Sequence, residues 1–185
     1  ENVQVFWNAS GKVKQVVTPE CTINYTYNPL GQRQSKEIIG DSTVKEWYLH
    51  DVTGNIMCIY RKTQSMHHLI YAAEQPIYGS KRLGVYERNE IIYERNMKSS
   101  YQDTVSIRGR IGDNRYELTD HLGNILSIVS DRKLGVGSNG VISYYSPEIR
   151  SYTDYYPFGF PIPDRSADLT DYRFGFNGQE KDDEI

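Results

Sequence analysis

One short pattern recurs along the chain and constrains its fold more than any other feature. An aromatic-rich run is followed by Asn or Asp, two further residues, Gly, and a second strand-like run. Asn or Asp in the first turn position accepts hydrogen bonds from nearby backbone amides, and Gly in the fourth supplies a positive φ. Each copy therefore predicts a β-hairpin closed by a type I turn, often with a bulge at Gly.

Four copies keep the Asn or Asp, and a fifth replaces it with an aromatic residue. The first turn residues are 20 positions apart (Asn8 to Asn28), then 23 (to Asp51), then 69 (to Asp120), which is three times 23. The missing units are either degenerate or replaced by an insertion. The predicted structural turn residues are Asn8 and Gly11, Asn28 and Gly31, Asp51 and Gly54, Asp120 and Gly123, and Gly159 of the fifth copy.

The composition suits half-buried sheets better than a helical bundle. The chain has 185 residues with 16 Tyr, and only 38% of its residues are apolar. Tyr packs its ring in a sheet and leaves its hydroxyl near water. We therefore expect an all-β fold of antiparallel hairpins with very little helix, limited to a turn or two near residues 146–149 or 167–169.

Charge and hydropathy exclude two classes of partner. The net charge is −3 and both signs are mixed, so the basic stripe typical of a nucleic-acid binder is missing. No apolar run is long enough to predict a membrane span.

Two polar or glycine-rich stretches predict loops. We expect an exposed loop at residues 96–112, between hairpins in residues 1–95 and a further segment in residues 113–185. A second flexible loop is predicted at Leu134–Gly140. Its Gly-x-Gly-x-x-Gly spacing lacks the βαβ setting that a dinucleotide site requires.

The ends of the chain predict open sheet edges. The chain starts without Met in a run that reads as the middle of a strand, which suggests a fragment of a longer protein. We expect unpaired edges at Val3–Trp7 and near Phe174–Asn177, which would promote aggregation unless another chain covers them.

These repeats resemble the YD repeats of RHS proteins. Three later segments are similar, in the same order, to elements of the RHS repeat-associated core of Bacteroidetes type. The segment Ile77–Tyr86 resembles a variant from the same group. The three core elements lie at Tyr116–Leu126, Tyr155–Gly159 and Tyr172–Asp182.

The resemblance implies that the hairpins form part of a sheet that spirals into a hollow shell. It implies a structural role in a large secreted or cell-surface protein that encapsulates or carries a C-terminal effector, often a toxin. The implied partners are the upstream repeats and effector of the parent polypeptide, and a secretion-system protein or a surface glycan. The family's self-cleavage motif begins with Asp-Pro, a pair that this sequence lacks. We therefore expect no catalysis and no cofactor.

The residues that could form a metal site or a catalytic site have simpler structural explanations. His50, His67, His68 and His121 do not suggest a converging set of metal ligands. Asp51 and Asp120 could form an acid–base pair, but their turn positions already account for them. The sequence therefore predicts no catalytic and no metal site. Cys21 and Cys58 are interpreted as buried free thiols, with a disulfide as the alternative.

Aromatic side chains provide the alternative function, an extracellular adhesion module that binds a glycan or a protein. Exposed rings on a sheet can stack on sugars or on a partner. The opposing interpretation is that the rings form cross-strand pairs within the sheet. The candidate residues are Trp7, Trp47, Tyr48, Tyr144, Tyr145, Tyr155 and Tyr156.

Overall fold

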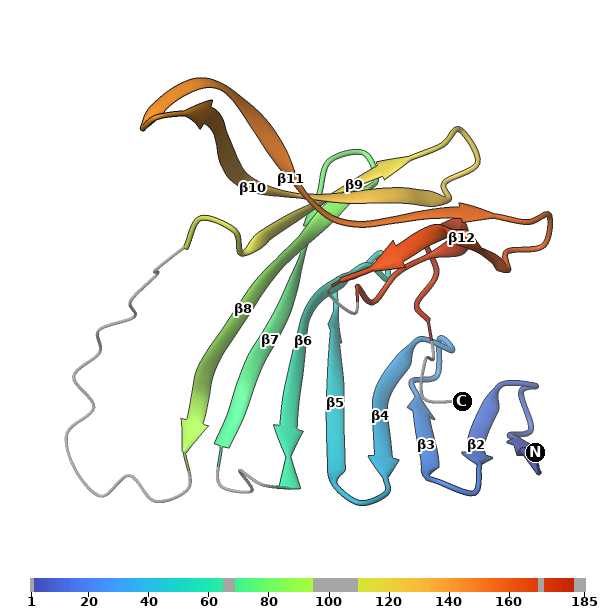
Figure 1. The fold of residues 1–185 in the computed structure, drawn as a ribbon. Helices are drawn as coiled ribbons and strands as arrows, with labels where there is room; N and C mark the ends of the chain where they lie inside the picture. Colours follow the sequence, from blue (N-terminus) through green and yellow to red (C-terminus); the bar gives the residue numbers. More distant parts are fainter. Residues whose placement is uncertain (1, 65–68, 95–109, 170–171, 182–185) are drawn as a thin grey trace. The chain divides into compact units, whose positions relative to one another are not determined.

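A computed structural model describes residues 2–64, 69–94, 110–169 and 172–181. It contains one antiparallel sheet whose twelve strands are adjacent in chain order (Figure 1). The all-β hairpin prediction is confirmed. Contacts divide the chain into two units. The first comprises Glu1–Pro76, Arg88–Ile107 and Asp183–Ile185, and the second comprises Ile77–Glu87 and Arg108–Asp182.

The strands of the first half are β1 (Gln4–Trp7), β2 (Val13–Val17), β3 (Thr22–Tyr27), β4 (Arg33–Ile39), β5 (Thr43–His50) and β6 (Ile56–Thr63). The later strands are β7 (Leu69–Tyr78), β8 (Arg82–Glu94), β9 (Asn114–Thr119), β10 (Ile125–Ser138), β11 (Val141–Tyr155) and β12 (Pro161–Asp168). A short 3-10 turn, η2 (Phe176–Gly178), comes after β12.

Side chains alternate between the two faces along the strands of the first unit, and the apolar ones gather in a small core on one face. Val16 pairs with Ile23 across β2 and β3, and Ile23 pairs with Ile38 across β3 and β4. Ile23 is fully buried and packs in a cluster with Val16 and Tyr25. Residues paired across antiparallel strands point to the same face, so this row is the core of the first unit.

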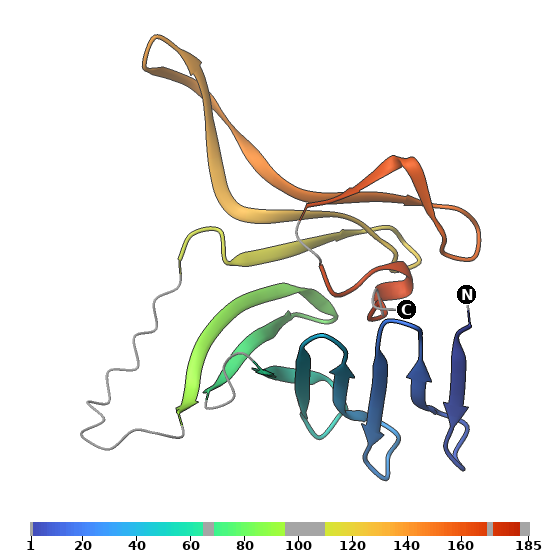
Figure 2. The same ribbon diagram turned by 60° about the horizontal axis from the view of Figure 1, so that its bottom comes forward.

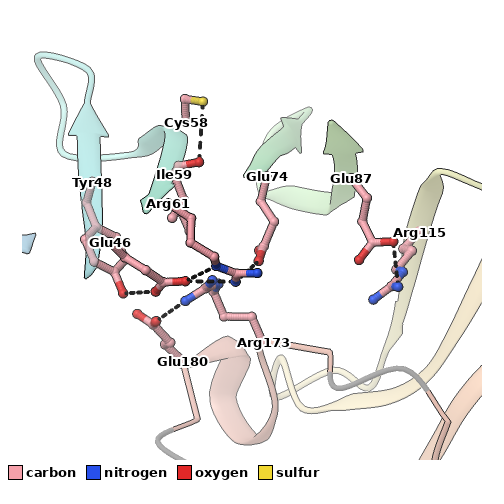
Figure 3. A network of polar contacts seen from close by, with 10 residues as sticks. All are labelled: Glu46, Tyr48, Cys58, Ile59, Arg61, Glu74, Glu87, Arg115, Arg173 and Glu180. Atoms are coloured by element: carbon pink, nitrogen blue, oxygen red, sulfur yellow. Dashed lines mark hydrogen bonds and ion pairs between the residues drawn. The ribbon is translucent and has the colours of Figure 1, made fainter. Parts of the chain in front are cut away.

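A row of charged residues lies on the same face, beside that apolar row. Lys36, Glu46 and Arg61 are cross-strand partners in β4, β5 and β6. Arg61 forms ion pairs with Glu46 at 2.8 Å and with Glu74 at 3.5 Å, and the Tyr48 hydroxyl donates to Glu46 (Figure 3). The contacts from Arg61 and Tyr48 compensate the charge of Glu46, which allows this carboxylate to be buried.

The core of the second unit combines strands β8 and β10 with the segment after β12. Val85 in β8 and Ile125 and Ile128 in β10 cluster with Tyr172 and Phe174. All five side chains are buried. The residues after the last strand are therefore part of the core of this unit.

The predicted flexible loop at Leu134–Gly140 is wrong. Leu134–Ser138 belongs to β10 and pairs with β11 up to a tight turn at Asn139 and Gly140, both of which have positive φ. An Asn-Gly pair with positive φ at both positions suits a two-residue hairpin turn. The other predicted loop, at residues 96–112, lies mostly outside the described residues.

The predicted helical turns are also wrong. Residues 146–149 lie in β11, and Ala167 and Asp168 pair with Tyr152 and Ser151 as part of β12. Cross-strand pairing outweighs the weak local preference of these segments.

The sheet edges lie partly where the sequence predicts. Strand β1 is one end strand and exposes Val5, Phe6 and Trp7. The edge predicted near Phe174–Asn177 is wrong, because β12 is the other end strand. Strand β12 carries Pro161 and Pro163, which lack the N–H donor that an added strand would use.

Gly84 provides a test of how closely β8 and β9 approach each other. A Cβ atom at Gly84 would overlap the backbone carbonyl of Arg115, whereas a Cβ at Gly123 would meet nothing within 4 Å. We predict that Gly84→Ala lowers the free energy of unfolding by about 3 kcal/mol or more, because the strands must separate. The matched change Gly123→Ala, which adds only positive-φ strain, costs about 1 kcal/mol. Urea denaturation of both variants measures the difference, and an equal loss contradicts this packing.

Candidate functional site

The predicted turn residues share one geometry. The Oδ1 atom of Asp51 accepts hydrogen bonds from the amides of Thr53 at 2.8 Å and Asn55 at 2.9 Å. The same atom of Asn8 accepts from the amides of Ser10 and Lys12. Asp120 does the same with Leu122 and Asn124, and Asn28 accepts from Gln32. One side chain thus fixes the backbone of each turn.

The glycines in fourth position have positive φ, from +73° at Gly11 to +98° at Gly54. In the fifth copy, Gly159 has a φ of +93° and donates its amide to the carbonyl of Tyr156. The ladder shifts register beside all five of these turns, as a bulge requires.

Neighbouring turns of the first unit also touch. A Cβ on Gly31 would lie 2.7 Å from Cε of Lys12, and one on Gly54 would lie 2.5 Å from Nε2 of Gln32. In both cases the side chain of the residue that follows one turn glycine extends over the turn glycine of the next hairpin. Glycine therefore serves twice, since it permits the turn and leaves room for the neighbouring hairpin.

A sixth turn of the same spacing was not predicted from the sequence. The amide of Gly178 donates to the carbonyl of Gly175, and the amide of Gly175 donates to that of Gln179. The turn lacks Asn or Asp in first position, but the fixed interval from Gly175 to Gly178 could have identified it. It folds the residues around it into a small hairpin, with a bridge between Phe174 and Glu180. Arg173 and Glu180 close this hairpin with an ion pair of 2.7 Å.

This small hairpin, residues 172–181, docks on the strands of the second unit and is called the terminal clip. Arg82 in β8 holds it in two ways. The guanidinium lies 3.5 Å from the centre of the Phe174 ring, and Nη2 donates to the carbonyl of Gly178 at 2.8 Å. A cation over an aromatic face in a partly desolvated site is favourable.

Glu117 in β9 completes the attachment. Its Oε1 atom accepts from Arg82 at 2.6 Å and from the Tyr172 hydroxyl at 2.7 Å, and only 3% of its side chain is exposed. A buried carboxylate is stable only with such charged and hydrogen-bonding partners. The site therefore depends on Arg82, Glu117 and Tyr172 together.

Asn124 links the clip to the turn that opens β10. Its Nδ2 atom donates to Asp120, and its Oδ1 atom accepts from the amide of Asn177 at 3.0 Å. The amide of Ile125 donates to the carbonyl of Gly175. Two of the sequence elements that resemble the RHS-associated core are thus brought together, one at the turn and one in the clip. They form the candidate functional site.

The predicted binding aromatics fall into three groups. Trp7, Tyr144, Tyr145 and Tyr156 are exposed, and Trp47 and Tyr155 are half-buried. Tyr155 packs edge-on against Phe176, and Trp47 lies beside Lys45. The prediction that the ring of Tyr48 is exposed is wrong. Tyr48 is buried, because it lies on the core face of β5 together with Glu46.

The other candidate groups do not converge. Within the part of the chain that the structure describes, no group of His, Cys, Asp or Glu could hold a metal ion. His67 and His68 lie outside the described residues. Neither Cys21 nor Cys58 forms a disulfide. Cys58 is buried, whereas the predicted burial of Cys21 is wrong, because this residue is only half-buried. Burial raises the pKa of the Cys58 thiol. None of the described helices is long and apolar enough to cross a membrane.

No protein-family model and no curated protein matches this sequence. The structure is similar to a solved one. The crystal structure of TcdB2-TccC3-TEV aligns over 98% of this chain with a TM-score of 0.55 and 14% sequence identity. The chain spans only 8% of that protein's length. At this identity the similarity establishes a shared fold.

The turn at Asp51 predicts a specific dependence of stability on pH. The hydrogen bond from the Thr53 side chain is the largest cause that holds the pKa of Asp51 well below its usual range. A lowered folded-state pKa stabilises the fold above the unfolded pKa of about 3.9, and this contribution is lost as pH falls below that value. We predict that Asp51→Asn, which keeps the turn, loses less stability than the wild type between about pH 4 and pH 2. Urea denaturation across this range measures it, and parallel curves contradict it.

The clip provides a second test. We predict that Arg82→Met lowers the free energy of unfolding by about 3–5 kcal/mol, because it leaves Glu117 buried without its cation. Arg165→Met is the matched control, since Arg165 is 67% exposed in its pair with Asp154 and should contribute less than about 1 kcal/mol. Urea denaturation compares them, and equal effects would mean that Arg82 does not hold the clip.

Proposed function

We propose that this chain is a wall segment of a large β-shell protein of the RHS type, and that it has no catalytic activity. In this role the sheet encloses or carries an effector that belongs to the same polypeptide. The parent protein is secreted or displayed on the cell surface.

The order of the strands supports this proposal. Each hairpin pairs with the one before it, and in the first unit the residue after one turn glycine covers the next turn glycine. Such a sheet grows by repetition and does not close on itself within one or two hairpins. The end strand β1 exposes a row of apolar side chains, which suits the addition of a further strand.

The terminal clip is the single observation that carries the proposal furthest. It ends at Lys181, whose amide donates to the carbonyl of Arg173 and whose side chain pairs with Asp168 at 2.9 Å. Any residues that come after it in the parent protein start from a point attached to the sheet. A shell that retains a downstream segment needs such an anchor.

The chemistry of the polar groups supports a structural role. The carboxylates of Asp51 and Asp120 each bind the amides of their own turn. Glu117 and Glu46 each neutralise an arginine. Each of these carboxylates therefore has a structural partner that accounts for its position.

Resemblance to known proteins supports the same role. The turn pattern and the three later segments resemble RHS proteins, and the fold is shared with part of TcdB2-TccC3-TEV. From this resemblance we propose that the principal partner of this chain is the rest of its parent polypeptide.

The test is limited proteolysis with mass spectrometry on the full-length parent protein. We predict that residues 172–181 resist cleavage in the wild type, and that Arg82→Met exposes them while residues 13–63 stay protected. Arg165→Met should leave the wild-type pattern unchanged. Cleavage of residues 172–181 at the rate of an unfolded peptide in the wild-type parent would contradict the anchor.

A further inference from the structure

One polar row crosses the first unit on the face opposite its core. Strands β2 to β6 lie side by side (Figure 2), and cross-strand pairing aligns one polar residue from each of them. The row consists of Gln15, Asn24, Glu37, Lys45 and Lys62. Lys45 comes directly before Glu46, which faces the core, so alternation along β5 turns the row away from the core.

The members of this row pair off and leave Lys62 over. The side chain of Gln15 donates to Asn24 at 2.8 Å, and Lys45 forms an ion pair with Glu37 at 3.2 Å. Among the residues that the structure describes, no carboxylate pairs with Lys62, which lies directly opposite Lys45. Like charges opposite each other in a sheet are unfavourable, so an anion between the two ammonium groups would stabilise this pair.

The adjacent row on the core face is arranged differently. There Lys36, Glu46 and Arg61 alternate in sign, and Arg61 also reaches the carboxylate of Glu74. Strands β4 to β6 therefore carry alternating charges on one face and two successive lysines on the other. The unmatched charge of Lys62 is specific to the outer row.

A hollow of about 320 Å³ opens beside the two lysines. Its walls are formed by Glu37, Thr43, Lys45, Lys62, Thr63 and Gln64. The amide of Thr43 donates to Oε1 of Gln64 at 3.1 Å and so fixes this side chain. The Nε2 group of Gln64 has no acceptor among the described residues and remains a donor for a ligand.

Lys45 is held in place without a ligand. Its Nζ atom lies 3.2 Å from Oε1 of Glu37 and 5.8 Å from the centre of the Trp47 ring. Trp47, one of the predicted binding aromatics, is thus a positioning residue for Lys45. A group that is already oriented loses less conformational freedom when a ligand binds.

The charges in the wall define the class of ligand. Two ammonium groups and one carboxylate give the hollow a net charge of +1. A monoanion matches this charge, whereas Glu37 would repel the second charge of a phosphate dianion. Glu37 also accepts hydrogen bonds from hydroxyl groups, and Gln64 donates to them. The volume lies at the lower end of the range for small-molecule sites, which suits one sugar ring.

We infer that this hollow binds an acidic sugar residue of the hexuronate class. Lys62 and Lys45 pair with its carboxylate, and Glu37 and Gln64 bind its hydroxyl groups. The site is open and the ligand is small, so the Kd for a single residue is about 1 mM. This inference does not depend on the proposed shell function, because it rests on β4 to β6 alone.

Methyl β-D-glucuronide and methyl β-D-glucoside are matched probes that differ in the carboxylate. Each is titrated to about 20 mM into the full chain, and two-dimensional NMR spectra of the backbone amides give the Kd. We expect the glucuronide to shift the amides of Thr43, Lys62 and Gln64. We expect the glucoside to bind at least about tenfold more weakly, because it cannot form charge-assisted hydrogen bonds with the lysines. Inorganic phosphate should also bind more weakly than the glucuronide.

Two lysine variants test the site itself. Lys62→Gln removes the unmatched charge and should weaken glucuronide binding at least about fivefold. Lys14→Gln is the matched control, since it removes an exposed lysine of β2 and should change the Kd less than about twofold. Lys62→Gln should unfold at the same temperature as the wild type or higher, because it removes a like-charge contact.

Four results would overturn the inference. They are an absence of shifts in the wild type, glucoside binding as tight as that of the glucuronide, phosphate binding tighter than that of the glucuronide, and equal losses in the two variants. The first three use the wild type, so they stand whatever the stability of the variants. The last would mean that the glucuronide responds to the overall charge of the chain and not to this hollow.

Discussion

The buried carboxylate of Glu117 is the interaction on which the second unit depends. It lies in β9, accepts from Arg82 of β8 and from Tyr172 of the clip, and so joins residues far apart in the sequence. Without both partners, its desolvation would oppose folding. Arg82 in turn needs Phe174 and the carbonyl of Gly178 to occupy its remaining surface. The residues that follow β12, Tyr172 to Lys181, are therefore integral to the fold of the second unit.

A second constraint, the turn with Asn or Asp in first place and Gly in fourth, organises the first unit. The side chain of Asn28 fixes its turn, and Gly31 leaves space for Lys12 of the preceding hairpin. Glycine in fourth position thus permits the turn of its own hairpin and also sets the distance to the neighbouring hairpin. The core is thin and centred on Ile23, and the ion pairs that the partly exposed Arg61 forms with Glu46 and Glu74 lie beside it (Figure 3). A sheet of repeated hairpins does not need a deep core, because each hairpin buries its surface on its neighbours.

Local signals were sufficient to predict much of this architecture. Asn8, Asp51 and Asp120 identify hairpins from sequence because the side chain acts on amides two and four residues away. The clip was not predictable in this way, since the contacts of Arg82 with Glu117 and Gly178 join positions 35 and 96 residues apart. The prediction at Leu134–Gly140 failed because glycine indicates both flexible loops and strands that pack closely. The prediction for Tyr48 failed because exposure depends on which face of β5 meets the core.

Native-state hydrogen exchange of the full chain tests the central claim most directly. The amides of Gly175, Asn177 and Lys181 are hydrogen-bonded within the clip or to Asn124. If the clip is part of the core, these amides exchange with the same opening free energy as the amides of Val85 and Ile128, in a single cooperative unit. If they exchange as fast as an unfolded peptide while Val85 and Ile128 stay protected, the clip is not anchored and the central claim is wrong.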